Sequence, residues 1–177
     1  MDAWQAGGEN LYRHKDAYYF LPSENEWYKA AYHQNDGVTA NYWDYATGSN
    51  SIPMEVADGT ETGTAVYYGQ AGPADVNLAG GLSAYGTMGQ NGNVWDWNES
   101  AYDGLNNSSS ESRAIRGGNW TNTEGPLRSS RRNFGSPPAS DSYIGFRVAS
   151  VPEPTSTGLM ISAGLLAIAR RRRRAAL

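Results

Sequence analysis

Hydrophobic and polar residues alternate in short runs along the chain, and few runs hold one period for long. The clearest pattern precedes residue 33, where three residues share one face of a helix: Trp27, Ala30 and Ala31. Ser23 and Glu26 stand before that face with the spacing of a capping box, in which each side chain accepts a hydrogen bond from the other residue's backbone N–H. The pattern predicts a helix from about Glu24 to His33.

Three shorter patterns predict strands and turns. Asn93–Trp97 and Ile144–Val148 alternate as half-buried strands do, with Ile144, Phe146 and Val148 on one face. Arg116–Trp120 is typical of a strand end that enters a tight turn. Residues 41–89 are rich in turn-forming residues, yet their recurring aromatics favour an ordered irregular layer over disorder. Residues 106–112 are expected to form a polar surface loop.

The chain divides near residue 150. Residues 1–150 are predicted to form one domain, and residues 151–177 a separate tail. Three residues end the domain, because two prolines so close together cannot continue a strand: Pro152, Glu153 and Pro154. Residues 155–169 carry no charge and predict a hydrophobic helix of roughly 22 Å, which is shorter than a typical bilayer core. Five consecutive arginines follow it: Arg170, Arg171, Arg172, Arg173 and Arg174.

Charge and composition exclude several functions. Residues 1–150 contain nine Lys and Arg against 17 Asp and Glu, a net charge of −8 that disfavours nucleic acid as a partner. The 177 residues include no cysteine, which excludes disulfides, thiolate catalysis, iron–sulfur clusters and cysteine-bound zinc. The two histidines, His14 and His33, are too few for a metal cluster or a triad and are interpreted as surface residues.

Four motifs in a fixed order identify a family resemblance: Leu21-Pro22-Ser23-Glu24-Asn25-Glu26-Trp27, Gly92-Asn93-Val94-Trp95-Asp96-Trp97, Arg116-Gly117-Gly118-Asn119-Trp120 and Gly145-Phe146-Arg147. Together they resemble the formylglycine-generating enzymes, or sulfatase-modifying factors. The resemblance covers about residues 18–149 and corresponds to the C-terminal part of the family domain. It implies an α+β, irregular C-type-lectin-like fold with little regular secondary structure. A truncated fragment with no independent fold or function is the alternative.

The resemblance also bears on catalysis. Oxidase members of the family use a pair of cysteines between their last two motifs to bind copper and to convert a sulfatase cysteine to formylglycine. Residues 118–145 of this chain contain no cysteine. The sequence therefore predicts a protein that is not an enzyme and binds no copper. The alternative is an enzyme of the same family that acts by a cysteine-independent mechanism.

The resemblance implies one metal site. Family members bind a structural calcium ion around the second motif, through backbone carbonyls and one acidic side chain. The matching residues here are Asn91, Gly92, Val94 and Asp96, with Asp96 in place of the family's usual glutamate. Calcium prefers six to eight oxygen ligands, and a glycine-containing turn with one carboxylate can supply part of such a set. The alternative is a packed turn with an ordinary carboxylate.

The tail resembles a PEP-CTERM sorting signal, which an exosortase reads in bacteria. Arginines resist crossing the membrane, so the resemblance implies a transient C-terminal membrane anchor and a protein of the cell envelope or the extracellular space. The expected role is binding or structural, toward extracellular polysaccharide or envelope proteins. Five arginines lie in the C-terminal third of the domain: Arg116, Arg128, Arg131, Arg132 and Arg147. They can line an anion- or glycan-binding groove with Trp120, or several of them can pair with carboxylates. Arg147 is expected to be structural.

Overall fold

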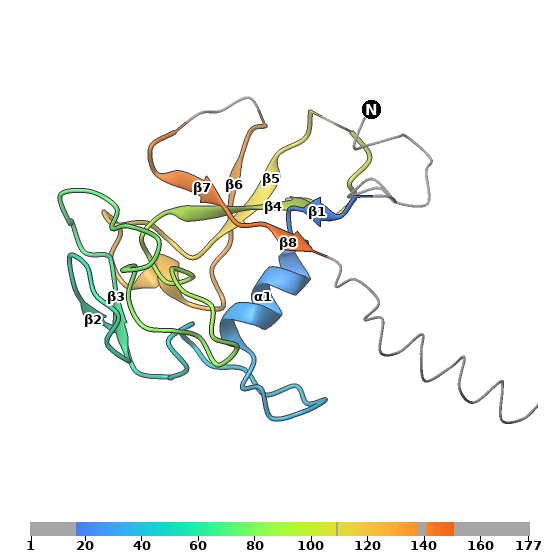
Figure 1. The fold of residues 1–177 in the computed structure, drawn as a ribbon. Coiled ribbons are helices and arrows are strands. Elements are labelled where there is room, and N and C mark those ends of the chain that lie inside the picture. The colour runs from blue at the N-terminus through green and yellow to red at the C-terminus, as the bar shows by residue number, and fades with distance from the viewer. Residues whose placement is uncertain (1–16, 109, 138–140, 151–177) are drawn as a thin grey trace, which may run out of the picture.

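The computed structural model describes residues 17–108, 110–137 and 141–150. One α-helix lies against a small sheet, and loops with very short strands make up the rest, as expected for an irregular α+β domain (Figure 1). The sheet has the strand order β6-β5-β4-β7, and two further pairs join β1 with β8 and β2 with β3. The elements are β1 (Tyr19–Phe20), α1 (Glu24–Tyr32), β2 (Met54–Glu55), β3 (Thr64–Ala65), β4 (Trp95–Ala101), β5 (Arg113–Arg116), the 3-10 helix η1 (Gly125–Leu127), β6 (Asn133–Gly135), β7 (Ile144–Phe146) and β8 (Ala149–Ser150).

Helix α1 begins as its local sequence predicts. The Glu26 N–H donates to Ser23 Oγ at 3.3 Å, and the Ser23 N–H donates to the Glu26 carboxylate at 2.8 Å, which completes the capping box. The helix ends at Tyr32, one residue before the predicted end, because His33 takes an extended backbone conformation. The helix packs against β4, and its buried residues are Trp27, Ala31 and Tyr32.

Strand β4 forms the centre of the sheet. It pairs antiparallel with β5 and parallel with β7. The strand predicted at residues 93–97 starts at Trp95 and continues to Ala101. Asn93 cannot belong to it, because its backbone φ of 61° lies in the left-handed region.

Two of the three residues on the apolar face predicted for residues 144–148 are exposed. Strand β7 ends at Phe146, whose exposed fraction is 67%, and Val148 is 55% exposed. β7 is an edge strand, and burial of its face depends on what packs over it, which alternation in the sequence does not specify. The prediction of a half-buried face at these two residues is therefore wrong.

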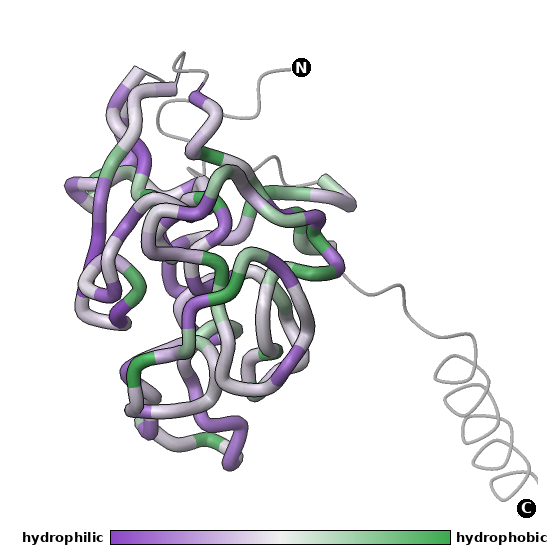
Figure 2. The backbone as a smooth tube through the Cα atoms, turned by 90° about the vertical axis from the view of Figure 1, so that its left-hand side faces the viewer, coloured by the Kyte–Doolittle hydropathy of each residue, from purple (hydrophilic) through white to green (hydrophobic). Residues whose placement is uncertain are grey.

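Residues 41–89 form an ordered irregular layer, as their aromatic residues predict. Tyr45, Ala65 and Tyr67 pack with Leu127 of η1 in one buried cluster. The Tyr67 hydroxyl also donates to the Pro53 carbonyl at 2.6 Å, which gives its polar end a partner. Figure 2 shows hydrophobic and hydrophilic residues following one another in short stretches, so the core is assembled from many segments.

The loop after β4 contains a buried asparagine. Asn106 is fully buried, and its Oδ1 accepts hydrogen bonds from the Ala101 N–H at 2.9 Å and from Arg113. The predicted polar surface loop is therefore wrong at Asn106. The Asn106 side-chain oxygen accepts the hydrogen bonds that hold the turn between β4 and β5, and these contacts keep the asparagine side chain out of solvent.

Strands β1 and β8 join the two ends of the described chain. Tyr19 lies opposite Ser150 in this antiparallel pair, and Phe20 lies opposite Ala149. The predicted C-terminal hydrophobic helix belongs to residues 151–177, which lie outside the described residues. Within residues 17–108, 110–137 and 141–150, no helix has the length and apolar character needed to cross a bilayer.

Candidate functional site

The second sequence motif opens with a tight turn at Gly92 and Asn93, whose φ angles are 74° and 61°. The Gly92 N–H donates to the Gly117 carbonyl at 2.7 Å, and the Asn93 N–H donates to the Val66 carbonyl at 2.7 Å. The Asn93 carbonyl accepts from the Trp120 N–H at 3.0 Å. These bonds tie the two middle motifs to each other and to the irregular layer.

Asp96 is the residue where three of the motifs meet. Its side chain is 5% exposed, and its Oδ2 accepts hydrogen bonds from Trp27 Nε1 at 2.9 Å and from Arg147 Nε at 2.8 Å. Burial raises the pKa of Asp96, and the Arg147 charge and the Trp27 hydrogen bond oppose that rise. The motifs therefore assemble one buried ion pair, which confirms that Arg147 is structural.

The surroundings of Asp96 fit calcium poorly. Calcium takes six to eight oxygens, whereas the one carboxylate of the proposed set already has a guanidinium as its counter-ion. The Asn91 Oδ1 accepts from the Ala46 N–H at 3.2 Å. Among the described residues, no three His, Asp or Glu side chains converge to hold a metal. Calcium binding by Asn91, Gly92, Val94 and Asp96 stays a prediction that these contacts do not favour.

The interval where family oxidases carry their cysteine pair contains residues that pack the fold. Residues 118–145 run from the turn after β5 through η1 and β6 into β7. Leu127 is fully buried there, and Trp120 stacks on Tyr143 with ring centroids 4.7 Å apart. The sequence provides no thiol in this interval or elsewhere. The residues present can stabilise the fold, but they offer no thiolate for copper or redox chemistry.

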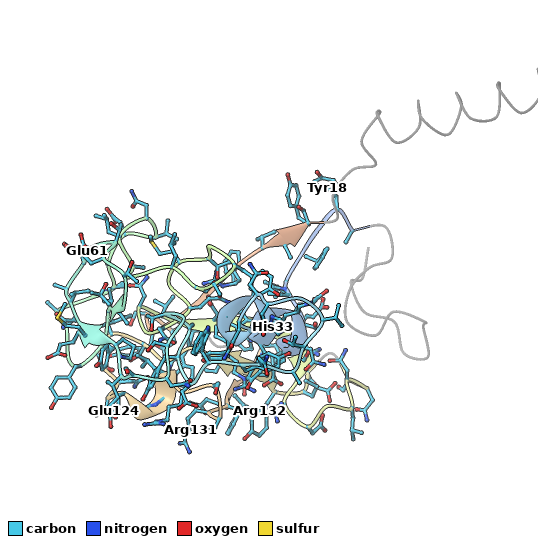
Figure 3. The ribbon with its side chains drawn as sticks, turned by 90° about the horizontal axis from the view of Figure 1, so that it is seen from below. Tyr18, His33, Glu61, Glu124, Arg131 and Arg132 are labelled. Atoms are coloured by element: carbon cyan, nitrogen blue, oxygen red, sulfur yellow. The ribbon has the colours of Figure 1, made fainter. Side chains whose placement is uncertain are left out.

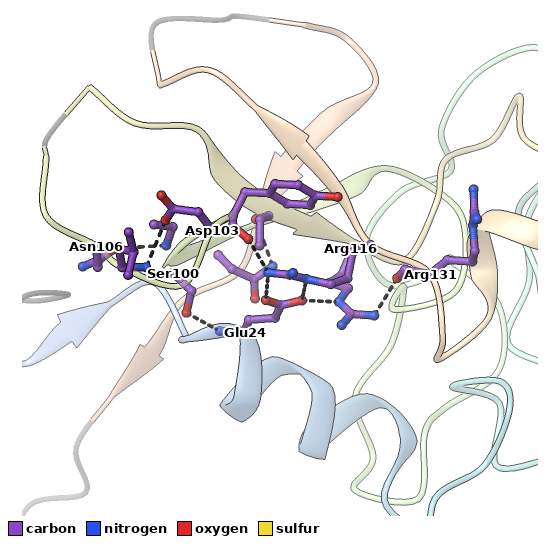
Figure 4. Close-up of polar contacts among 12 residues, drawn as sticks. Glu24, Ser100, Asp103, Asn106, Arg116 and Arg131 are labelled. Carbon is purple, nitrogen blue, oxygen red and sulfur yellow. Dashed lines mark hydrogen bonds and ion pairs between the residues drawn. The ribbon is translucent and has the colours of Figure 1, made fainter.

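Two arginines share one carboxylate at the start of α1 (Figure 4). Arg116 Nε donates to Glu24 Oε1 at 2.7 Å, and Arg132 donates from Nε and Nη2 to both Glu24 oxygens at 2.7 and 2.6 Å. The prediction that several arginines pair with carboxylates is confirmed by Arg116, Arg132 and Arg147. Trp120 is buried, so it lacks the open face that a shared groove would require.

The network around Glu24 was not predicted. The sequence pattern places Glu24 only at the start of a helix, whereas its two arginine partners lie 92 and 108 residues further along the chain. The one feature of the sequence that points to this network is the number of arginines after residue 112. It indicates that some of them pair with carboxylates, but not with which ones.

His33 is buried, and its interpretation as a surface residue is wrong. It is 1% exposed, and its Nδ1 accepts from the Asn35 N–H at 3.0 Å and lies 3.0 Å from the Tyr85 hydroxyl. Its Nε2 lies 3.1 Å from the Thr39 carbonyl oxygen. These contacts fix the chain where it leaves α1, so His33 serves the fold. His14 lies outside the described residues.

Comparison with known proteins adds five findings. A family model described as "Sulfatase-modifying factor enzyme 1-like domain" matches residues 3–151, and one described as "PEP-CTERM protein-sorting motif" matches residues 150–174. A search of curated proteins finds no match. The structure of Treponema denticola variable protein 1 is similar with a TM-score of 0.56 and 21% identity, over 83% of this chain and 54% of that one. The crystal structure of CarF is similar with a TM-score of 0.54 and 23% identity, over 79% and 51%.

These findings differ in what they establish. The two structural likenesses support the fold, and this chain spans about half the length of each of those proteins. The first family model covers most of the sequence and includes all four motifs, which confirms the predicted resemblance. The chain belongs to the sulfatase-modifying factor enzyme 1-like domain family, and a PEP-CTERM protein-sorting motif follows the domain.

Proposed function

We propose that this chain is an exported, non-catalytic binding domain whose C-terminal signal is processed by an exosortase. The observation that carries the proposal is the absence of cysteine from all 177 residues. The oxidase chemistry implied by the family resemblance uses a thiolate pair as copper ligands, and no other side chain supplies a soft, redox-active sulfur anion.

The contacts of the motif residues support a structural role for them. Trp27 and Arg147 both donate to Asp96, and Arg116 donates to Glu24. An enzyme acting without cysteine would need a perturbed acid, base or nucleophile facing a substrate. Asp96 has a perturbed pKa, but its charge is already paired within the fold. The motifs therefore favour a scaffold that presents its outer surface to a ligand.

The first prediction concerns oxidation. We expect the full chain, incubated with copper, oxygen and a cysteine-containing sulfatase peptide, to give no formylglycine by mass spectrometry, because the chain has no thiolate to bind the metal. A cysteine-containing oxidase of the family, run in parallel, shows that the assay detects turnover. Formylglycine production above the protein-free control would contradict the non-catalytic proposal.

The PEP-CTERM motif implies recognition by an exosortase and export to the cell envelope or beyond. The order of the apolar and charged segments along the tail suits that role. Residues 155–169 are uncharged and can enter a bilayer, whereas Arg170–Arg174 resist crossing it and hold the C-terminus on the cytoplasmic side. Pro152, Glu153 and Pro154 then lie on the opposite side, next to the domain.

The second prediction concerns processing. We expect the mature protein from its native envelope to end near Pro152–Pro154 and to lack Arg170–Arg174, which intact-mass measurement can establish. Replacing Pro152 and Pro154 by alanine should leave the tail attached in the same cells. Mature protein that retains the five arginines would show that the motif acts as an ordinary anchor.

The proposed ligand is extracellular polysaccharide or another envelope protein. Support comes from the combination of an export signal with an irregular domain whose surface carries many exposed aromatic side chains, such as Tyr68, Phe134 and Phe146. Exposed aromatics are common where a protein binds a ligand, because they bury a large area on contact.

A further inference from the structure

We propose that residues 128–132, together with the neighbouring rings of Tyr102 and Phe134, bind a carboxylate-bearing polysaccharide. The proposal rests on the non-catalytic binding function proposed for the domain, and it names the ligand class and the surface. This arginine surface comprises Arg128, Arg131, Arg132, Tyr102 and Phe134. Figure 3 shows Arg131 and Arg132 along one edge of the molecule, with Tyr18 at the opposite edge.

Buried contacts hold the arginine surface from beneath. Arg116 is buried, and its Nη1 donates to the Ser129 carbonyl at 2.8 Å and to the Arg131 carbonyl at 2.5 Å (Figure 4). Glu24 fixes Arg116 and Arg132 through the same carboxylate. A side chain that is already fixed loses less conformational entropy on binding, so Arg132 and the backbone of Ser129 and Arg131 are organised before a ligand arrives.

The exposed arginines keep donors for an external anion. A guanidinium has five N–H groups, and the Nε and Nη2 groups of Arg132 serve Glu24 and the Tyr102 carbonyl. Its Nη1 donates to no residue in the described part of the chain, and its side chain is 37% exposed. The Arg131 guanidinium likewise binds none of the described residues, and Figure 4 shows it leading away from Glu24. The Arg132 Nη1 and the Arg131 guanidinium can therefore each donate to a carboxylate.

The charge around this surface favours an anionic ligand. Glu24 faces two guanidinium groups, so that cluster carries one positive charge in excess. The Arg128 guanidinium lies over the Tyr45 ring, and the negative charges of Asp44 and Glu124 act on the same tyrosine. These two carboxylates offset the charge of Arg128, so the excess positive charge of residues 128–132 belongs mainly to Arg131 and Arg132. Residues 1–150 carry a net charge of −8, so a polyanion is repelled by most of the domain and attracted to this edge.

Two rings beside the arginines fit a sugar better than they fit a small inorganic anion. The Tyr102 and Phe134 ring centroids are 5.1 Å apart, and the Arg132 guanidinium lies 4.7 Å from the Tyr102 centroid. Phe134 is 55% exposed. The C–H face of a pyranose packs on an aromatic face and buries apolar area, while a carboxylate on the same sugar reaches the guanidinium. A uronic acid unit combines both groups.

The test measures binding of the full chain, in detergent, to immobilised polygalacturonate and to neutral dextran. We expect binding to polygalacturonate alone, and weaker binding as salt is raised. Arg131→Gln should lower the affinity about tenfold, the effect of losing one charge-assisted hydrogen bond. Lys29→Gln removes the same charge from an exposed residue of α1 that is not part of the arginine surface, and it should change the affinity less than about twofold, because salt screens charges that do not contact the ligand. Phe134→Ala should also weaken binding, with the melting temperature confirming that each variant is folded.

Each outcome decides between the two proposals. Loss of affinity in Arg131→Gln and Phe134→Ala, but not in Lys29→Gln, supports the arginine surface. Equal binding by all variants, or equal binding of dextran, overturns this surface and leaves the non-catalytic binding function standing. Binding of neither polymer overturns both the surface and polysaccharide as the domain's ligand. Arg131-dependent binding to vesicles of anionic phospholipid, without polygalacturonate binding, would show that the ligand class is wrong.

Discussion

Replacing Arg147 by glutamine is expected to lower the free energy of unfolding by about 3 kcal/mol, because the buried Asp96 carboxylate loses its guanidinium partner. The Arg147 side chain is 26% exposed, so solvent screens one end of the pair and the loss should lie at the lower end of the range for buried pairs. For a chain of this size the melting temperature should fall by roughly 6–12 °C. Thermal unfolding of the parent and the variant at neutral pH measures the difference.

The double variant Asp96→Asn/Arg147→Gln is the matched control. An asparagine oxygen can still accept from Trp27 Nε1, and no unpaired charge remains, so the double variant should be more stable than Arg147→Gln alone. Burial raises the pKa of Asp96, so its ionised form is the costly one. The loss in Arg147→Gln should therefore be smallest below the unfolded carboxyl pKa of about 3.9 and should grow as the pH rises. A single variant as stable as the parent at neutral pH would show that the pair contributes nothing.

The same melting curves address calcium. With Arg147 as the counter-ion of Asp96, the parent should melt at the same temperature with calcium and with a chelator. A calcium-dependent rise that disappears in Asp96→Asn would instead establish ligation by this residue, since an ion that binds the folded state alone stabilises it by mass action.

Gly92→Ala is expected to be the most damaging single substitution in the second motif, with a loss above about 4 kcal/mol. A Cβ at residue 92 would overlap the Val66 carbonyl oxygen, which is backbone and cannot rotate away. That carbonyl also accepts the Asn93 N–H, so moving it breaks the contact between the motif and the irregular layer. The measurement is thermal or denaturant unfolding of the full chain.

Gly86→Ala separates this overlap from backbone strain. Gly86 has a φ of 75°, nearly the same as the 74° of Gly92, but nothing lies within 4 Å of a Cβ there. Its substitution should cost about 1–2 kcal/mol, the strain of a left-handed residue alone. Equal losses at both positions would show that the Val66 carbonyl yields to the new methyl group.

Local rules predicted the parts of the fold that depend on neighbouring residues. The capping box of α1 needs only Ser23 and Glu26, three residues apart, and it is formed as expected. The turn after β5 follows from Gly117 and Gly118, both of which have positive φ. The aromatic residues between 41 and 89 indicate order, because disordered segments usually contain few aromatic side chains.

Contacts between distant residues escaped prediction. Asp96 and Arg147 are 51 residues apart, and their pairing depends on β4 and β7 lying side by side, which alternation alone does not reveal. His33 was misplaced for the same reason, since Tyr85 comes from another segment. Phe146 shows the opposite error, since the pattern predicts a half-buried residue and the side chain is exposed. An apolar residue on an edge strand is buried only if another segment packs over it.

The pairing of β1 with β8 determines the length of the tether between the domain and the sorting signal. Strand β8 ends at Ser150, and Pro152 is two residues further, so the intervening chain spans at most about 7 Å. If the tail enters a bilayer as proposed, the β1–β8 end of the domain sits close to the membrane surface. Tyr18 lies at that end and Arg131 at the opposite edge (Figure 3), so under the proposed anchoring the domain would turn Arg131 away from the membrane.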